Sequence, residues 1–402
     1  MHLKYFHFIL SIMMLAISMV SCEPSGSAER NISRTPSVPV HIDVVIGEED
    51  QPFEHLLGNP IGVCTDSKGN IYIADKASLK VKVFDSQGNY LRSFGGRGRG
   101  PGEFLDINLM QLAGDDTLLF QDRGKLEFIY MTTQGEYISS HPVNLSNQYY
   151  PKTIKWNKRN SIGLMQKASP PRFPPPPIQR PLFYVYDKEF QTQRAAFFPF
   201  NQLGYTESEM FVWSSFIYQP GSFDLLPESN KLIYSPGVYI GKLYEFIPSD
   251  NLKWTLQKTI TAYTPSSTYE IYNSEAEYES MREIPGVNMI RFVSIPSWGR
   301  LYSIDAGVYY LNDGKIAHFF GEWRGGDKTL EEGNTLDISV QILDDKRTII
   351  AHSYLFSLTL DRRPSLLLVN WKDNEDNFYL LNLNKDDVPK VTKFRLDLDG
   401  IL

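Results

Sequence analysis

Short apolar segments alternate with polar turns along most of the chain. The pattern is clearest between residues 59 and 96, where apolar segments over 61–65, 71–74, 81–84 and 90–94 are separated by turns rich in Gly, Asn and Asp. Segments of this length joined by such turns are typical of β-strands that pair in an antiparallel meander. We therefore expect one four-stranded unit in this region.

The second strand of this unit has counterparts along the chain. Apolar segments that follow a polar turn begin at Ile71, Leu118, Ile162, Leu232, Leu301 and Ile349. Each is followed by a candidate third strand and a turn, and in the last two units these third strands fall at 309–311 and 379–381. A single meander cannot bury both of its faces, whereas meanders stacked around an axis can. The repeats therefore predict an all-β fold, a six-bladed β-propeller of four-stranded antiparallel blades.

The first apolar segment after the leader, His41–Ile46, has no unit of its own. A ring of blades has to join its two ends, whereas a linear array would need capping repeats. We expect this N-terminal strand to pair with the last blade, beside Val391–Leu398, and so to close the propeller.

The composition of the chain suits a large core, and its net charge argues against one class of partner. Of the 402 residues, 42% are hydrophobic and 13% are aromatic, which suits a large core built from strands. The formal net charge of −7 argues against a general affinity for nucleic acid, which requires a basic surface. The chain has two cysteines, Cys22 and Cys64. Cys64 lies in an apolar segment, so we interpret it as a small buried side chain rather than a reactive thiol.

The N-terminus has the pattern of an export signal. Lys4 precedes an apolar segment, Phe8–Val20, which is too short to span a bilayer and is followed by Ser21 and Cys22. A small residue directly before a cysteine at this point resembles the bacterial lipoprotein signal. Two alternatives stay open: ordinary cleavage beside an unmodified cysteine, and a retained membrane helix.

The lipoprotein resemblance implies an order of segments and a location. The signal peptide would span 1–21, Cys22 would carry the lipid, and 22–40 would form a flexible tether. Residues 41–402 would then form the propeller domain. The protein is expected at the cell envelope, anchored by lipid in the outer membrane and facing either the periplasm or the cell surface.

The first unit also resembles a known repeat. It contains GNIYIAD followed by VKVFD, and then a glycine-rich approach to the next unit, Gly95–Phe104. These motifs resemble the NHL repeat. Together with the leader, they make the chain similar to the six-bladed propeller lipoproteins of Bacteroides-like bacteria. That family has no settled biochemical function, so the resemblance implies fold and location alone.

The longest connections fall on one side of the predicted propeller. In a four-stranded blade, the loops between the second and third strands leave from the same side as the loops between blades. Loops longer than about a dozen residues are uncommon unless they are functional or disordered. We therefore expect this side to bind the ligand. The connections concerned are 95–104, 166–181, 201–210, 263–289, 321–335 and 353–376.

Several residues in or near these connections are candidates for ligand binding. They are Arg97, Arg99, Glu103, Arg172, Trp213, Trp323 and Arg324. Guanidinium groups suit planar anions such as carboxylates and phosphates, and an indole can stack on a sugar ring. Each candidate has a structural alternative. The arginines can be solvated residues of a linker, the proline-rich segment around Arg172 can be a rigid flap, and the tryptophans can belong to the core.

Motifs for catalysis and metal binding are missing from the sequence. The histidines after the leader show no metal-ligand spacing, and no Gly-x-Ser-x-Gly elbow occurs. His318 falls in a segment that we interpret as an outer strand, where a packed or surface role is expected. We assign no catalytic residue, no metal and no cofactor.

The sequence therefore favours a non-catalytic binding or scaffolding module at the cell envelope. Its partner would be a glycan, a peptide or an envelope protein, and not nucleic acid. The alternative is a metal-dependent propeller hydrolase or lyase with its site at the central tunnel, which would contain stoichiometric metal and lose activity on chelation. A third hypothesis is a sensor of an envelope ligand that acts through a separate signalling protein.

Overall fold

A computed structural model describes most of the chain from Pro36 onward. The described residues are 36–114, 116–143, 149–156, 161–167, 181–187, 190, 192–203, 220–226, 230–249, 252–272, 298–324, 334–360, 367–384, 387–399 and 401. Residues Pro36–Leu402 belong to one compact unit. The expected signal peptide and Cys22 lie outside the described residues.

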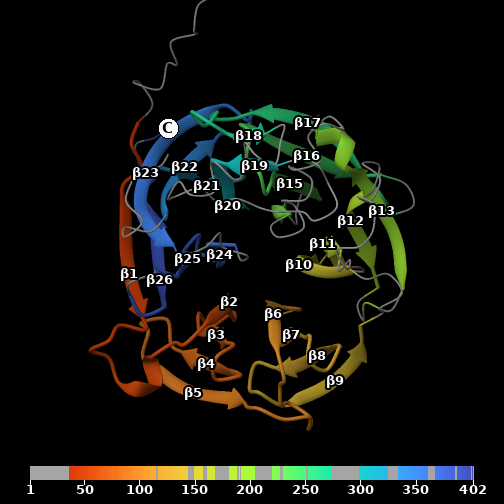
Figure 1. The fold of residues 1–402 in the computed structure, drawn as a ribbon, viewed down its shortest axis with the longest axis vertical. Helices are drawn as coiled ribbons and strands as arrows, with labels where there is room; N and C mark the ends of the chain where they lie inside the picture. The colour runs from red at the N-terminus through yellow and green to blue at the C-terminus, as the bar shows by residue number, and fades with distance from the viewer. Residues whose placement is uncertain are drawn as a thin grey trace, which may run out of the picture. The chain divides into compact units, whose positions relative to one another are not determined.

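The described residues form six four-stranded antiparallel sheets and one two-stranded sheet (Figure 1). Sheet 1 contains β2 (Pro60–Thr65), β3 (Ile71–Asp75), β4 (Lys80–Phe84) and β5 (Tyr90–Gly95). Sheet 2 contains β6 (Ile107–Leu112), β7 (Thr117–Asp122), β8 (Glu127–Thr132) and β9 (Tyr137–Pro142). Sheet 3 contains β10 (Tyr149–Trp156), β11 (Ser161–Lys167), β12 (Pro181–Tyr186) and β13 (Gln193–Pro199).

The other sheets follow in chain order, except that the last one takes its fourth strand from the N-terminus. Sheet 4 contains β14 (Gly221–Leu226), β15 (Lys231–Pro236), β16 (Lys242–Pro248) and β17 (Trp254–Thr261). Sheet 5 contains β20 (Ser303–Tyr310), β21 (Ile316–Trp323), β22 (Asn334–Leu343) and β23 (Ile349–Leu360). Sheet 6 contains β24 (Val369–Lys372), β25 (Phe378–Asn382), β26 (Lys390–Leu396) and β1 (Val40–Ile46). The two-stranded sheet contains β18 (Tyr269–Tyr272) and β19 (Trp298–Leu301), and the short 3-10 helices are η2 (Phe53–His55) and η3 (Phe200–Leu203).

Apolar clusters connect each sheet with its neighbours in the described part of the chain. Each cluster combines buried residues from two sheets. The pairs of sheets are 1 and 2, 2 and 3, 3 and 4, 4 and 5, 5 and 6, and 6 and 1. Both faces of every sheet are therefore covered, as expected for meanders that cannot bury both faces alone.

The first strands of neighbouring sheets also contact one another. The strand β2 contacts both β6 and β24, and β14 contacts both β10 and β20. Figure 1 shows β2, β6, β10 and β24 towards the centre, with β5, β9, β13 and β17 at the perimeter. Burial follows the same order, since β2 and β3 are buried throughout whereas β5 is mostly partly exposed. The expected all-β architecture of four-stranded antiparallel sheets is confirmed.

The N-terminal strand completes the last sheet. Strand β1 pairs antiparallel with β26, with Ile46 opposite Val391 and His41 opposite Arg395. The expected pairing of 41–46 with the segment after Val391 is therefore present. Sheet 6 consequently combines strands from the two ends of the described chain.

The strand assignment of the last two units was wrong. Leu301 ends β19, outside the four-stranded sheets, and Ile349 opens β23, the fourth strand of sheet 5. Residues 309 and 310 end the first strand of sheet 5, and 379–381 belong to the second strand of sheet 6. The inner strands of a sheet can be buried alike, as β20 and β25 are, so the apolar pattern does not distinguish their order.

The same error affected two of the long connections. Residues 353–360 of the expected loop 353–376 belong to β23. The connection within 321–335 joins the second and third strands of sheet 5 rather than two sheets. Both corrected connections still leave from the same side as before, because loops between second and third strands share that side with loops between sheets.

The same hydrogen-bonded turn joins the first and second strands of sheets 1 and 6. Asp66 precedes β3, and its carboxylate accepts backbone hydrogen bonds from Lys68 and Asn70 at 2.9 Å, an amide hydrogen bond from Asn70 at 2.8 Å and the Tyr72 hydroxyl at 3.0 Å. Asp373 repeats this pattern before β25. It accepts from the Glu375 and Asn377 backbones, the Asn377 side chain and the Tyr379 hydroxyl. The spacing Asp-x-x-x-Asn-x-Tyr marks the turn between the first and second strands, and it was overlooked at 373–379.

The closing strand offers a matched pair of substitutions. Ile46→Ala removes a side chain that is 1% exposed, and we expect it to lower the free energy of unfolding by about 2–5 kcal/mol because it leaves a cavity between sheets 6 and 1. Ile42→Ala, on the same strand at 66% exposure, should change it by less than about 0.5 kcal/mol. Urea denaturation of both variants tests the role of β1, and equal stabilities would contradict it.

Candidate functional site

The glycine-rich loop between β5 and β6 is folded back on itself. The Phe104 amide donates to the Gly96 carbonyl at 2.8 Å, and the Gly98 amide donates to the Phe104 carbonyl at 3.0 Å. The Phe104 ring is fully buried between sheets 1 and 2. Lys125 from sheet 2 donates its ammonium to the Gly100 carbonyl at 3.0 Å. The loop is therefore held in place from both sheets.

One glycine in this loop is required by its backbone, because Gly95 has a φ of +87° with the Phe104 ring 2.8 Å from a Cβ. A Cβ on Gly98 would lie 1.9 Å from the Glu103 carboxylate, so the Glu103 side chain would have to move. Glu103 accepts a hydrogen bond from the Gly100 amide at 2.7 Å, so its carboxylate closes the turn. Glu103 is exposed, and the structure gives it this role within the loop.

The loop presents two arginines to solvent. Arg97 and Arg99 are both exposed, and neither guanidinium has a hydrogen-bond partner among the described residues. Arg324 and Arg347, by contrast, are paired with Asp337 and Glu245. The structure therefore brings Arg97 and Arg99 together on one ordered loop, with donors available for an anion.

Trp323 and Arg324 lie at the end of β21 and differ in exposure. Trp323 is 6% exposed and belongs to the cluster between sheets 5 and 6, which favours the alternative that it is a core residue. Arg324 is exposed and forms a bidentate ion pair with Asp337, with both distances at 2.7 Å. Arg172 and Trp213, the other candidates, lie outside the described residues.

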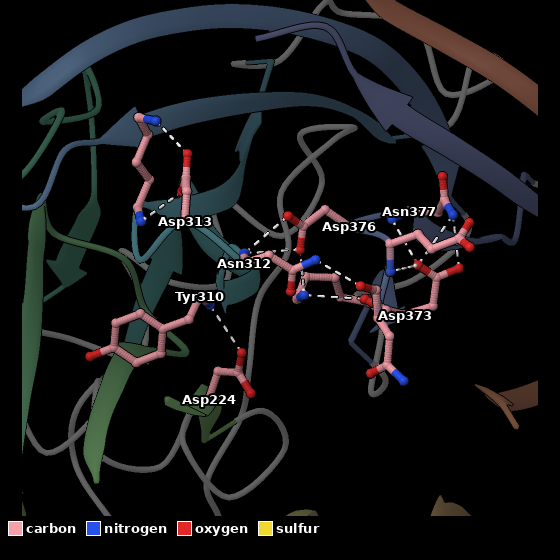
Figure 2. A network of polar contacts seen from close by, with 11 residues as sticks. Asp224, Tyr310, Asn312, Asp313, Asp373, Asp376 and Asn377 are labelled. Atoms are coloured by element: carbon pink, nitrogen blue, oxygen red, sulfur yellow. Dashed lines mark hydrogen bonds and ion pairs between the residues drawn. The ribbon is translucent and has the colours of Figure 1, made fainter. Parts of the chain in front are cut away.

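The opposite side of the sheets carries a network of carboxylates (Figure 2). Asp224 on β14 accepts the Tyr310 amide of β20 at 3.0 Å. In the next seam, Asp376 accepts the Asn312 amide at 3.0 Å and the Lys372 ammonium at 2.6 Å. These contacts connect sheets 4, 5 and 6 at the turns between their first and second strands. In each seam, a carboxylate of one sheet therefore accepts a backbone hydrogen bond from the next sheet.

A buried ion pair joins sheets 4 and 5 nearby. Glu245 on β16 accepts hydrogen bonds from Arg347 Nε at 2.9 Å and Nη2 at 2.5 Å, and from the Tyr310 hydroxyl at 3.0 Å. Glu245 is 3% exposed and Arg347 is 8% exposed. Three donors on one carboxylate oxygen offset part of the cost of burying the two charges.

The same seam contains the residue types of a catalytic triad. Ser235 Oγ lies 2.9 Å and Asp305 Oδ1 lies 3.2 Å from the same atom, His318 Nε2. Gln341 donates its amide to His318 Nδ1 at 2.8 Å, and the Gln341 oxygen accepts the Tyr263 amide at 2.9 Å, which orients the side chain. The His318 proton therefore resides on Nε2. A general base for serine needs an unprotonated nitrogen facing the hydroxyl, so this arrangement does not activate Ser235.

His318 was expected in an outer strand, and this was wrong. It lies in β21, the second strand of sheet 5, with no exposed surface. Burial lowers its pKa below the ordinary value of 6.5, although the hydrogen bond to Asp305 acts in the opposite direction. Cys64 is fully buried in β2, as expected, and burial raises the pKa of its thiol well above the usual range.

A pocket of about 200 Å³ lies between sheets 3 and 4, and none of the candidate residues that the structure describes lines it. Its lining residues are Val185, Asn230, Pro248, Ser249, Leu252, Lys253 and Trp254. Among the described residues, no group of three or more His, Cys, Asp or Glu side chains is placed to hold a metal ion. None of the helices in the described ranges has the length and apolar character that a membrane crossing needs.

Comparison with known proteins supports the propeller fold. Residues 54–161 match the family model DUF5128, described as a 6-bladed beta-propeller. The solved structure of a DUF4221 family member from Bacteroides vulgatus has a TM-score of 0.56 at 11% identity, with 90% of this chain and 99% of that chain covered. At that identity the likeness shows the fold alone. Searching the curated proteins gave no match.

Two further structures are similar at lower scores. A Bacteroides fragilis protein named for its expected export has a TM-score of 0.48 at 9% identity, with 89% of this chain and 95% of that chain covered. Virginiamycin B lyase from Staphylococcus aureus has a TM-score of 0.42 at 10% identity, with 90% and 100% covered. At these scores neither carries an argument about this chain.

The buried histidine makes stability depend on pH. Because the pKa of His318 is lowered in the folded protein, the unfolded chain binds a proton more readily below about pH 6.5. The contribution of neutral His318 to the free energy of unfolding is therefore complete at higher pH and is lost as the pH falls. We expect the free energy of unfolding to fall between about pH 7.5 and about pH 5.5, and to fall less in His318→Gln.

The control for this prediction is His41→Gln. The His41 side chain is 52% exposed on β1, so this variant should keep the pH dependence of the unchanged protein. Urea denaturation at both pH values provides the measurement. The same loss of stability in His318→Gln as in the unchanged protein would contradict the assignment.

Proposed function

We propose that this protein is an exported, lipid-anchored module of the cell envelope that binds or scaffolds a partner without catalysing a reaction. Its body would be a closed six-bladed propeller in which the six sheets are the blades. The apolar cluster between sheets 6 and 1 and the pairing of β1 with β26 support closure. The family model that matches residues 54–161 also has six blades.

The observation that carries the binding function is the glycine-rich loop. Contacts from two sheets hold it in place, and it presents Arg97 and Arg99 without partners in the part of the chain that the structure describes. Two donors that are held in place lose little conformational entropy on binding. A surface of this kind suits a carboxylate or phosphate group of a glycan, a peptide or another envelope protein.

The buried polar groups support a non-catalytic function. The Ser235, His318 and Asp305 side chains lie in the seam between sheets 4 and 5 without exposed surface on His318 or Asp305. The tautomer set by Gln341 directs the His318 proton towards Ser235 and Asp305. These groups stabilise the contact between sheets instead of meeting a substrate.

The binding function predicts the effect of removing both arginines. We expect a component of the native envelope to co-purify with the full chain and to be lost from the Arg97→Ala/Arg99→Ala double variant, because its anionic group loses its donors. Native mass spectrometry of gently isolated protein measures this. Arg395→Ala is the control, because Arg395 is 59% exposed elsewhere, beside Asp43.

An unchanged bound component in the double variant would contradict the assignment of this loop. The thermal unfolding temperature of the double variant should match that of the unchanged protein, since both side chains are exposed. A large decrease would indicate a structural role for the arginines instead.

The anchor predicts a change of location. Cys22→Ala should move the protein from the membrane fraction to the soluble fraction, because the protein would lose its acyl chains while its body stays folded. Fractionation of cells that express each form, followed by immunoblotting, measures the distribution. Membrane retention of the Cys22→Ala protein would contradict acylation as the tether.

A further inference from the structure

The third and fourth strands of sheet 5 are longer than their counterparts. Strand β22 has 10 residues and β23 has 12, whereas the corresponding strands of sheet 1 have 5 and 6. The additional pairing, up to Asn334 opposite Leu360, lies on the side of the long connections. On one face of this extension Leu336, Leu358 and Leu360 are buried in the core.

The other face of the extension carries a chain of polar groups. Arg324 donates to Asp337 through Nε and Nη2, both at 2.7 Å, and Nη2 also donates to Ser357 Oγ at 2.9 Å. Ser357 donates its own proton to Asp337 at 2.5 Å. The Ser357 oxygen therefore accepts the remaining contact, which comes from the Tyr354 hydroxyl at 2.8 Å. The donor and the acceptor of every hydrogen bond in this series are therefore defined.

Tyr354 is the exposed end of this series of hydrogen bonds. Its side chain is 56% exposed, although its hydroxyl is held by Ser357. The register of β23 against β22 shifts next to Tyr354, between Ile338 and Ser339. A bulge of this kind redirects side chains and is frequent beside binding sites. The ring is consequently presented to solvent in a fixed orientation.

The groups left unused by this network have a specific chemistry. Among the described residues, the Nη1 atom of Arg324 has no acceptor and keeps two donors, and the Tyr354 oxygen keeps a lone pair because its proton goes to Ser357. Hydrogen bonds from Arg324 and Ser357 lower the pKa of Asp337 despite its partial burial, so the carboxylate stays ionised. The Arg324–Asp337 pair therefore has no net charge, unlike Arg97 and Arg99.

We propose that Tyr354, Arg324, Asp337 and Ser357 form a subsite for a neutral pyranose ring of a carbohydrate. The apolar face of a pyranose stacks on an aromatic ring, and its hydroxyl groups both donate and accept hydrogen bonds. Donors and acceptors beside an exposed aromatic ring match both requirements. A site without net charge gives a charged sugar no advantage. The proposal rests on the binding function above, for which it names a ligand class.

The test is a glycan array probed with the full chain, followed by calorimetric titration. The array contains neutral hexose oligosaccharides and their uronic-acid counterparts. We expect the neutral oligosaccharides to bind and Tyr354→Ala to weaken binding by at least about tenfold, because stacking is lost. Tyr354→Phe keeps the ring and should weaken binding by only about threefold.

Tyr137→Ala is the matched control. Tyr137 is 42% exposed on the outer strand β9, and its hydroxyl donates to Ser140 three residues on, at 3.1 Å. This site reproduces an exposed tyrosine bonded to a serine. Unlike Ser357, Ser140 has no hydrogen bond to an Arg–Asp pair among the described residues. Tyr137→Ala should leave carbohydrate binding unchanged.

Two outcomes would overturn the proposal. One is that no neutral oligosaccharide binds, or that the Arg97→Ala/Arg99→Ala variant, which lacks the arginine loop's donors, still binds uronic-acid forms more tightly than neutral ones. The other is that binding is as strong in Tyr354→Ala as in Tyr137→Ala. Loss of the co-purifying envelope component from the Arg97→Ala/Arg99→Ala variant tests the arginine loop separately, so failure of this subsite can be told apart from failure of that loop.

Discussion

Each sheet of this protein has two apolar faces, and neither can be left in contact with water. The described residues meet this constraint with a separate cluster between each pair of neighbouring sheets, including the last and the first. Each large apolar side chain buried in such a cluster contributes about 1.5–3 kcal/mol. The N-terminal strand β1 follows from the same constraint, because Ile46 covers the junction of sheets 6 and 1.

Apolar clusters alone set the alignment of neighbouring sheets loosely, and buried polar groups set it more strictly. Between sheets 4 and 5, Glu245 reaches Arg347 and Tyr310, and Gln341 reaches Tyr239 as well as His318. A shift between these sheets would leave several buried donors and acceptors without partners, each at a cost of about 1–3 kcal/mol. The residue types of a catalytic triad therefore take a structural role here, decided by burial and by the tautomer of one histidine.

The surfaces proposed for binding are the places where one sheet departs from the others. The loop after sheet 1 carries two exposed guanidinium groups that no described residue pairs, and the extended hairpin of sheet 5 carries an aromatic ring beside a neutral ion pair. The packing of the sheets against one another does not require either feature, since other sheets pack without them. The two surfaces differ in charge, so they suit different chemical groups on one ligand or on two.

The sequence by itself determined the strand content and the four-stranded repeat, because short apolar segments and turn residues are local signals. The pairing of the N-terminal strand was inferred differently, from a strand that has no unit of its own. The sequence also located Arg97 and Arg99 on an exposed loop. Only the tertiary structure decided the order of the strands in sheets 5 and 6, because the inner strands of a sheet can be buried alike. The tertiary structure also buried Trp323 while leaving Arg324 exposed. It linked Tyr354 to Arg324 through Ser357, although the two residues are 30 positions apart in the sequence. Contacts between strands distant in the chain leave no local pattern, so burial and partnership at such positions depend on the packed sheets.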